Sequence, residues 1–105
     1  MRIRRGEIRW ADLDPRDRRP VLVLSQDVFN ERSGTVVAVA LTRRPQRAGF
    51  PLVLRLSASP LPPWSWLKVG QVRTLSTERI GDLLGEAGPE ELAQAVEGLG
   101  EIIGG

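Results

Sequence analysis

The stretch Pro20-Val21-Leu22-Val23-Leu24-Ser25 constrains the fold more than any other part of this sequence. Its run of four consecutive apolar residues, two of them β-branched, is typical of a strand that is buried on at least one face. Pro20 takes the first position of the predicted strand, where a missing N–H does little harm. Because Arg19 precedes a proline, its backbone is expected to be extended, which holds its guanidinium at the rim of the core. Taken alone, however, Arg18 and Arg19 are more simply explained as solvated charges that end a strand.

A second apolar stretch, Thr35-Val36-Val37-Ala38-Val39-Ala40-Leu41-Thr42, is apolar on both faces and predicts a central strand. It is followed directly by Arg43-Arg44-Pro45. If the two strands pair antiparallel, the start of the first lies beside the end of the second. That pairing would bring Arg19 and Thr42 together at one rim of the core.

The remaining pattern predicts short elements. We expect a half-buried strand at residues 7–12, one or two helical turns at 25–32 with Ser25 as N-cap, and further strands at 50–56, 67–74 and 82–87. In the strand at 67–74, Gln71 and Arg73 continue the face of the apolar residues. Gly88-Pro89-Glu90-Glu91 opens a helix whose apolar stripe is formed by Leu92, Val96, Leu99 and Ile103. The sequence therefore predicts one domain, residues 1–105, with a mainly β fold: a small curved sheet or partly open barrel with a short helix and a terminal α-helix.

The chain contains no histidine, no tyrosine and no cysteine, and these absences limit its chemistry more than any motif does. Disulfides, thiolate or histidine metal sites and histidine-based acid–base catalysis within one chain are excluded. We expect no metal and no cofactor. The lack of cysteine fits a cytoplasmic protein, no stretch approaches the ~20 apolar residues of a membrane span, and the basic N-terminus has no apolar region that would make it a signal peptide.

Charge is divided sharply along the chain. Residues 1–79 carry all fifteen basic residues and seven acidic ones, a net charge of +8, whereas residues 80–105 carry six acidic residues and no base, a net charge of −6. Fourteen of the fifteen bases are arginine, whose planar fork of donors suits phosphate. A polyanion would therefore meet a positive field over the first three-quarters of the chain. A general preference for arginine would give the same composition.

Many short segments, taken in order, resemble the MazF/PemK toxin family. They are Arg5-Gly6-Glu7-Ile8, Trp10, Asp12-Leu13-Asp14-Pro15, Arg19-Pro20-Val21-Leu22-Val23-Leu24-Ser25, Phe29-Asn30, Ser33-Gly34-Thr35, Leu41-Thr42, Gln71-Val72-Arg73-Thr74-Leu75 and Pro89-Glu90-Glu91-Leu92. No single segment is specific, but together they span nearly the whole chain.

The resemblance implies an SH3-like barrel with a terminal helix, usually a homodimer, and a metal-independent endoribonuclease that acts on single-stranded RNA and is neutralised by a small antitoxin. It places the family's catalytic Arg on Arg19 and its catalytic Thr on Thr42, and it associates Gln71 and Arg73 with the RNA groove. Cleavage by the neighbouring 2′-hydroxyl needs no external nucleophile, only positioning and stabilisation of the charge that develops on phosphorus. The absence of histidine is therefore no obstacle to this function.

One departure from the family pattern concerns a loop. Family members usually carry a longer connection between the Asp-Leu-x-Pro turn and Arg-Pro, whereas here only four residues join Pro15 to Pro20. Because the longer loop normally covers the RNA groove, we expect an open site in which Arg16, Arg18 and Arg43 contact RNA beside Arg19. Two alternatives remain open: a toxin of the same fold that acts on a protein target, as gyrase poisons do, and a catalytically weak or inactive RNA-binding relative.

Overall fold

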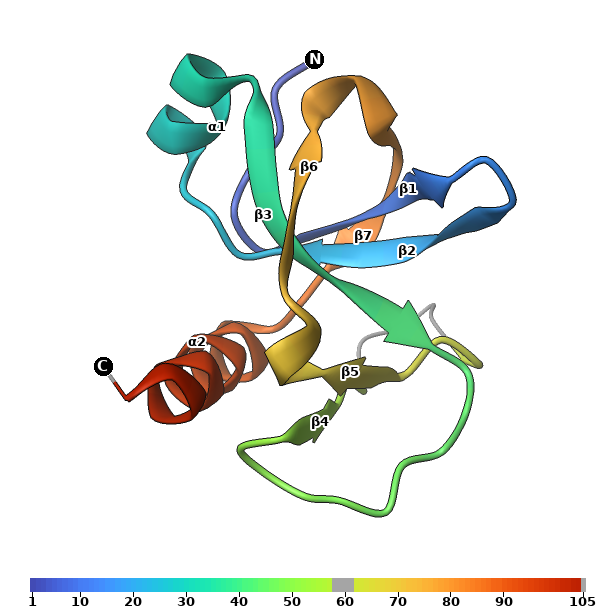
Figure 1. Ribbon diagram of the computed structural model, residues 1–105, viewed down its shortest axis with the longest axis vertical. Coiled ribbons are helices and arrows are strands. Elements are labelled where there is room, and N and C mark those ends of the chain that lie inside the picture. Colours follow the sequence, from blue (N-terminus) through green and yellow to red (C-terminus); the bar gives the residue numbers. More distant parts are fainter. Residues whose placement is uncertain (58–61, 105) are drawn as a thin grey trace.

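In a computed structural model, which describes residues 1–57 and 62–104, seven strands form one strongly bent antiparallel sheet flanked by two α-helices (Figure 1). The strands are β1 (Glu7–Asp14), β2 (Asp17–Val23), β3 (Thr35–Thr42), β4 (Val53–Arg55), β5 (Trp66–Lys68), β6 (Arg73–Ser76) and β7 (Ile80–Glu86). The helices are α1 (Asp27–Ser33) and α2 (Pro89–Ile103), and two 3₁₀ turns are η1 (Val69–Gln71) and η2 (Thr77–Arg79). The predicted fold class, mainly β and partly open with a short helix and a C-terminal helix, is confirmed.

Strand β3 joins the two halves of the sheet. It pairs with β2 at Val21↔Ala40, Leu22↔Val39 and Val23↔Ala38, so the two core strands have the antiparallel pairing under which Arg19 and Thr42 were expected at one rim. Its first four residues also pair with β6, whereas its last two pair with β5. Figure 1 shows β3 crossing from the upper layer, which contains β1 and β2, to the lower layer, which contains β4 and β5. The bend in β3 thus opens the sheet at the end of the strand.

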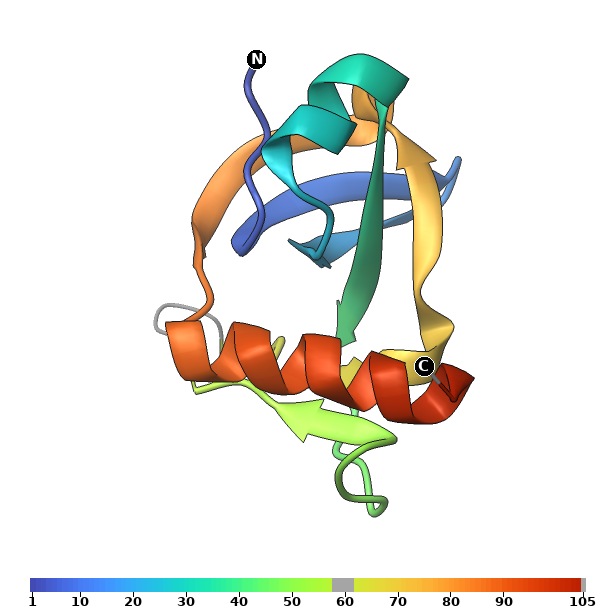
Figure 2. The same ribbon diagram turned by 90° about the vertical axis from the view of Figure 1, so that its left-hand side faces the viewer.

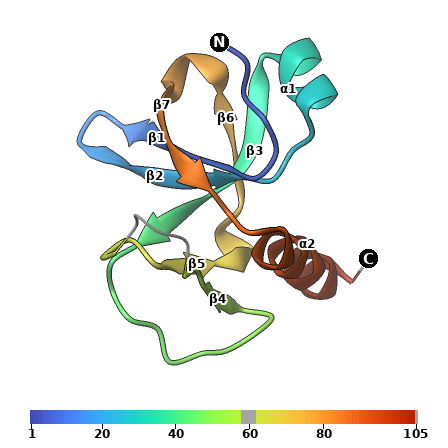
Figure 3. The same cartoon turned by 180° about the vertical axis from the view of Figure 1, so that it is seen from behind.

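The strands bury two apolar clusters. The lower cluster contains Ile8, Leu22, Leu41 and Leu67 and is covered by α2 (Figure 2). The upper cluster contains residues from β1, β2, β3, β6 and β7. Strand β7 pairs with β1 and crosses in front of it when the molecule is seen from behind (Figure 3). Successive residues of a strand point to opposite faces, so each core strand contributes to both clusters.

Helix α2 begins where predicted but does not have quite the predicted stripe. Leu92, Val96 and Leu99 pack against the lower cluster, and Ala95 is buried there, whereas Ile103 is 71% exposed. The helix ends at residue 103, so Ile103 lies beyond the edge of the surface that the other three cover. Within the described part of the chain, no helix is long and apolar enough to cross a membrane.

Two predictions near the first hairpin are wrong. Strand β2 begins at Asp17 rather than Pro20, because residues 17–19 continue the ladder with β1 as far as Asp14↔Asp17. The N-cap of α1 is Gln26 rather than Ser25. The Ser25 hydroxyl instead accepts a hydrogen bond from the backbone N–H of Val37, 2.9 Å away, and so links the start of the helix to β3.

The long strand predicted at 67–74 is also wrong, because η1 divides it into β5 and β6. Both pieces pair with β3, but Leu41↔Leu67 and Ala38↔Arg73 belong to registers that differ by three residues. The three residues of η1 take up this offset. Gln71 therefore lies in a 3₁₀ turn and does not share a strand face with Arg73.

Candidate functional site

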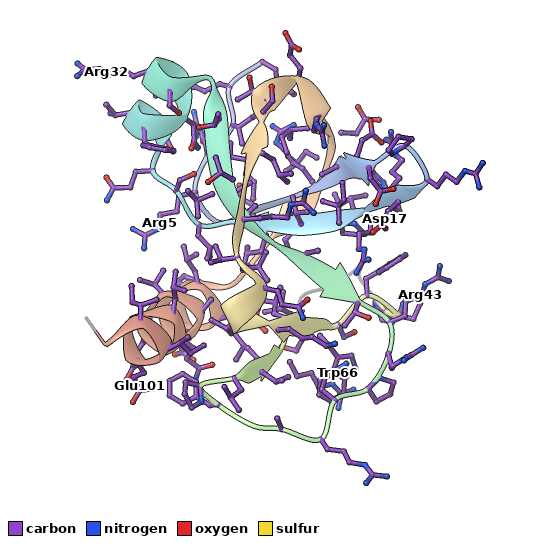
Figure 4. The ribbon with its side chains drawn as sticks, in the orientation of Figure 1. Arg5, Asp17, Arg32, Arg43, Trp66 and Glu101 are labelled. Atoms are coloured by element: carbon purple, nitrogen blue, oxygen red, sulfur yellow. The ribbon has the colours of Figure 1, made fainter. Side chains whose placement is uncertain are left out.

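Arg19 and Thr42 lie at the same end of neighbouring strands. The β2–β3 ladder ends at Val21↔Ala40, next to Pro20, which has no N–H to donate. Arg19 and Thr42 each lie two residues beyond this last pair, so they occupy the same face as Val21 and Ala40. There β3 bends away from β2, and Thr42 pairs with Trp66 of β5 instead. In Figure 4 the labelled sequence neighbours Asp17 and Arg43 lie on the same side of the molecule.

Asp17 holds the guanidinium of Arg19. The Arg19 Nε donates to one carboxylate oxygen of Asp17 at 2.9 Å, and Nη2 donates to the other at 2.7 Å. Residues two apart on a strand share a face, which is why both side chains meet. These hydrogen bonds lower the pKa of Asp17 below its ordinary value and raise the pKa of Arg19 above its own. The sequence analysis missed this pair because it began the strand at Pro20.

Thr42 is half-buried, and its hydroxyl oxygen accepts a hydrogen bond from the backbone N–H of Arg44 at 3.3 Å. An accepting hydroxyl keeps its own proton free for donation. Among the described residues, no hydrogen bond joins Thr42 to Arg19. The two side chains thus stand on one face, with the guanidinium fixed by an acid and the hydroxyl able to donate.

Arg73 lies on the same face as Arg19. The pairing of Arg73 with Ala38 of β3 puts it on this face, and its charge contributes to lowering the pKa of Asp17. Its Nη2 donates to the Leu13 carbonyl oxygen at 3.3 Å, and Nη1 of Arg79 donates to the same oxygen at 3.1 Å. Arg79 was not predicted as a site residue, since nothing in the sequence indicates that η2 returns it to the end of β1.

Arg18 and Arg43 lie on the opposite face, each stacked on a tryptophan. The guanidinium carbon of Arg18 is 5.6 Å from the ring centroid of Trp10, and that of Arg43 is 4.3 Å from the centroid of Trp64. The two rings meet edge to face at 6.3 Å. This Arg–Trp cluster joins the β1–β2 hairpin to the end of β3, and alternation along the strands separates it from Arg19 and Thr42.

The last two predicted residues lie apart from this face. Arg16 is exposed in the two-residue turn of the β1–β2 hairpin, where its backbone N–H donates to Asp14. Gln71 is exposed in η1, which packs against α2. No described contact links Gln71 to Arg19 or Thr42.

Comparisons with known proteins agree on one family. Residues 4–103 match the model of the PemK-like, MazF-like toxin of type II toxin–antitoxin systems. Endoribonuclease MazF6 of Mycobacterium tuberculosis is 33% identical over 112 residues, which cover 98% of each chain. A crystal structure of MazF from Deinococcus radiodurans superposes with a TM-score of 0.86 at 28% identity, covering 100% of this chain and 99% of the other. An endoribonuclease from a mycobacterial species, solved in complex with its cognate antitoxin, gives a TM-score of 0.82 at 28% identity and covers 97% and 95% of the two chains.

Proposed function

Because this chain belongs to the PemK-like, MazF-like toxin family of type II toxin–antitoxin systems, we propose that it is an endoribonuclease toxin whose catalytic residues are Arg19 and Thr42. Its substrate in this proposal is single-stranded RNA. The relatives described above are MazF proteins or endoribonucleases, which favours this function over action on a protein target. RNA as the substrate would place its action in the cytoplasm.

The observation that carries the catalytic proposal is the shared face of Arg19 and Thr42 at the open end of β2 and β3. In the reaction, the 2′-oxygen forms a bond to phosphorus and the bond from phosphorus to the 5′-oxygen breaks. The products are a 2′,3′-cyclic phosphate and a free 5′-hydroxyl. Water at the rim takes the proton of the 2′-hydroxyl and supplies the proton that the 5′-oxygen gains. Arg19 stabilises the negative charge that develops on the phosphoryl oxygens, and the Thr42 hydroxyl donates a hydrogen bond to one of these oxygens.

Asp17 is a poor candidate for a general base. Its hydrogen bonds with Arg19 lower its pKa, so at neutral pH it has little tendency to take the proton of a 2′-hydroxyl. We assign it instead to the orientation of Arg19. The groups that act in the reaction are then a guanidinium and a hydroxyl, and neither needs a bound metal ion.

Other arginines would hold the RNA on either side of the cleaved bond. Arg73 shares the face of Arg19, whereas Arg18 and Arg43 present stacked guanidiniums on the other face. RNA that crosses the open rim would contact both faces. The RNA-binding residues in this proposal are Arg16, Arg18, Arg43, Gln71 and Arg73.

The experiment is cleavage of a mixed single-stranded RNA by the pure protein in EDTA. Wild type should give cyclic-phosphate ends, and Arg19→Ala should lower kcat by about 10² to 10³, the usual loss when one donor to a developing oxyanion is removed. Arg4→Ala is a control because it removes the same charge at an exposed position of the N-terminal segment. If no RNA is cleaved, the nuclease proposal fails. If Thr42→Ala still inhibits growth fully, the protein-target alternative is favoured.

We further propose a cognate antitoxin as partner. The mycobacterial relative was solved with its own antitoxin, and this chain covers 95% of that relative. A segment of acidic character would complement the basic rim formed by Arg19, Arg73 and Arg79. Binding of such a segment there would compete directly with RNA.

A homodimer is the third part of the proposal. Within the stretch 64–73, Leu67 and Val69 are buried in the core of the chain and offer no surface to a second copy. A groove of about 760 Å³ between α1 and α2 leaves Val28 and Phe29 exposed instead. Arg5 and Arg32 line this groove, and Figure 4 shows acidic Glu101 on α2 below it. A two-fold axis would set the basic side of one copy against the acidic side of the other. A monomeric mass by light scattering at micromolar concentration would contradict the dimer.

A further inference from the structure

A row of four side chains crosses the sheet at the candidate site. The order of strands is β2, β3, β5 and β4. Thr42 pairs with Trp66, Trp66 pairs with Arg55, and Arg19 lies two residues beyond the last β2–β3 pair, on the strand face that Thr42 also occupies. Side chains that are directly opposite in antiparallel ladders share a face, so the row reads cation, hydroxyl, indole and cation.

Trp66 serves no evident role in the core. Its neighbour Leu67 is fully buried in the lower cluster, and Trp64 packs against that cluster, whereas Trp66 points away from it and is half-exposed. The guanidinium carbon of Arg55 lies 5.2 Å from the centroid of the Trp66 ring. Figure 4 shows Trp66 below Arg43, on the side of the molecule that also carries Asp17. The half-exposed indole of Trp66 and the guanidinium of Arg55 therefore lie one and two strands away from Thr42.

We propose that Trp66 and Arg55 form a stacking subsite for the nucleobase that flanks the cleaved phosphate of single-stranded RNA. This assignment rests on the proposed function only in placing that phosphate at Arg19 and Thr42. Bases without a paired strand stack on aromatic rings and on the planes of arginine guanidiniums. Adjacent strands are about 4.8 Å apart, so Trp66 meets the neighbouring nucleotide rather than the phosphate itself. Arg55 is then placed to contact the next phosphate.

Stacking on Trp66 should accept any base, because every base has a π-face and stacking does not depend on the base edges. Its contribution is therefore to affinity and to the path of the strand. A purely structural role for the Trp66–Arg55 pair would instead stabilise the β4–β5 edge and leave RNA binding unchanged. The two roles differ in how binding depends on the presence of bases.

The test is binding of two uncleavable probes at fixed salt, followed by fluorescence anisotropy. One is a labelled single-stranded 2′-O-methyl RNA of mixed sequence, and the other is an abasic chain of the same length and charge. Trp66→Leu should weaken binding of the first about tenfold and change binding of the abasic probe less than twofold. Arg55→Ala should weaken both probes and reduce the slope of log K against log salt by about 1.

Controls separate folding and general charge from stacking. Arg4→Ala removes one exposed positive charge and should affect both probes equally and weakly. Trp66→Phe keeps a smaller ring and should weaken RNA binding two- to threefold, which tests the proposal even if Trp66→Leu unfolds. Wild-type binding of both probes with equal affinity, or equal weakening of both by the Trp66 variants, would overturn the subsite. Because neither probe is cleaved, a failure of the nuclease proposal does not affect this result.

Discussion

Replacing Asp17 by asparagine tests how Arg19 is held. The carboxylate receives two of the five N–H groups of Arg19, through Nε and Nη2, and leaves the other three for a substrate. Asparagine is nearly the same size and keeps one acceptor oxygen, but it cannot accept both bonds or provide a charge. The guanidinium would keep its charge and lose its fixed plane.

The expected effect on stability is small and that on catalysis is larger. About a third of each side chain is exposed, at 33% and 34%, so the pair is screened by water and contributes about 0.5–1 kcal/mol to folding. Displacement of a catalytic group by about 1 Å can slow a reaction about 10²-fold. We therefore expect Asp17→Asn to lower kcat by about 10- to 100-fold and to change KM less than threefold, because the positive charge that attracts RNA remains.

The assay is cleavage of single-stranded RNA in EDTA over a range of concentrations, with Asp82→Asn as the matched control. Asp82 is an exposed acid on β7, so its loss changes the net charge equally without touching Arg19. Asp17→Glu should retain part of the rate, since a longer carboxylate can still pair with the guanidinium. If Asp17→Asn were as fast as wild type or faster, Asp17 would mask Arg19 rather than orient it, and the reasoning would fail.

Three further predictions concern stability. Because the pKa of Asp17 is lowered in the folded state, its contribution to the free energy of unfolding is complete above about pH 4 and is lost as the pH falls further. The difference in unfolding free energy between wild type and Asp17→Asn should therefore shrink in acid, and a difference that grows would contradict this. Arg9→Ala removes the cation 2.9 Å from the buried carboxylate of Glu7 and should lower the free energy of unfolding, measured in urea, by about 3–5 kcal/mol. A loss below about 1 kcal/mol would show that water replaces the Arg9 guanidinium. Gly98→Ala places a Cβ 3.0 Å from the Pro51 carbonyl oxygen, and this clash should outweigh the gain of about 1 kcal/mol in helix propensity. The melting temperature should therefore fall, and a rise would mean that the segment before β4 moves to relieve the clash.

The parts of the fold that the sequence predicted are those set by local pattern. The stretch from Thr35 to Thr42 is apolar on both faces, and the strand has those bounds because it is central and carries side chains into both clusters. The start of α2 follows from Pro89 and the two acids after it. Antiparallel pairing of β2 with β3 was, in the sequence analysis, the condition for bringing Arg19 and Thr42 to one rim, and the structure has that pairing.

Register and distant contacts could not be predicted in this way. The alternation at 67–74 is compatible with one strand, and only the three-residue difference between the β3–β5 and β3–β6 registers requires the turn at η1. The stacking of Arg43 on Trp64 joins residues far apart in the sequence, and no periodicity reveals it. Arg79 was missed for the same reason, since its partner Leu13 belongs to another strand. Of the residues assigned by family resemblance, Arg19, Thr42 and Arg73 share one face and Gln71 lies apart in η1. Arg18 and Arg43, expected to contact RNA because the loop is short, lie on the opposite face.

The short β1–β2 connection leads to a last prediction about selectivity. The chain turns within two residues, and β2 begins at once with Asp17, so this hairpin cannot fold over the rim beside Thr42. A site without such a cover excludes water poorly. Contacts to phosphate carry no sequence information, and the proposed stacking on Trp66 accepts every base, so neither contributes to selectivity. We therefore expect slower and less sequence-selective cleavage than in long-looped relatives. Sequencing of the product ends from a long single-stranded RNA should reveal many cut sites of similar yield. One dominant cut site would show that selectivity arises from groups other than this hairpin.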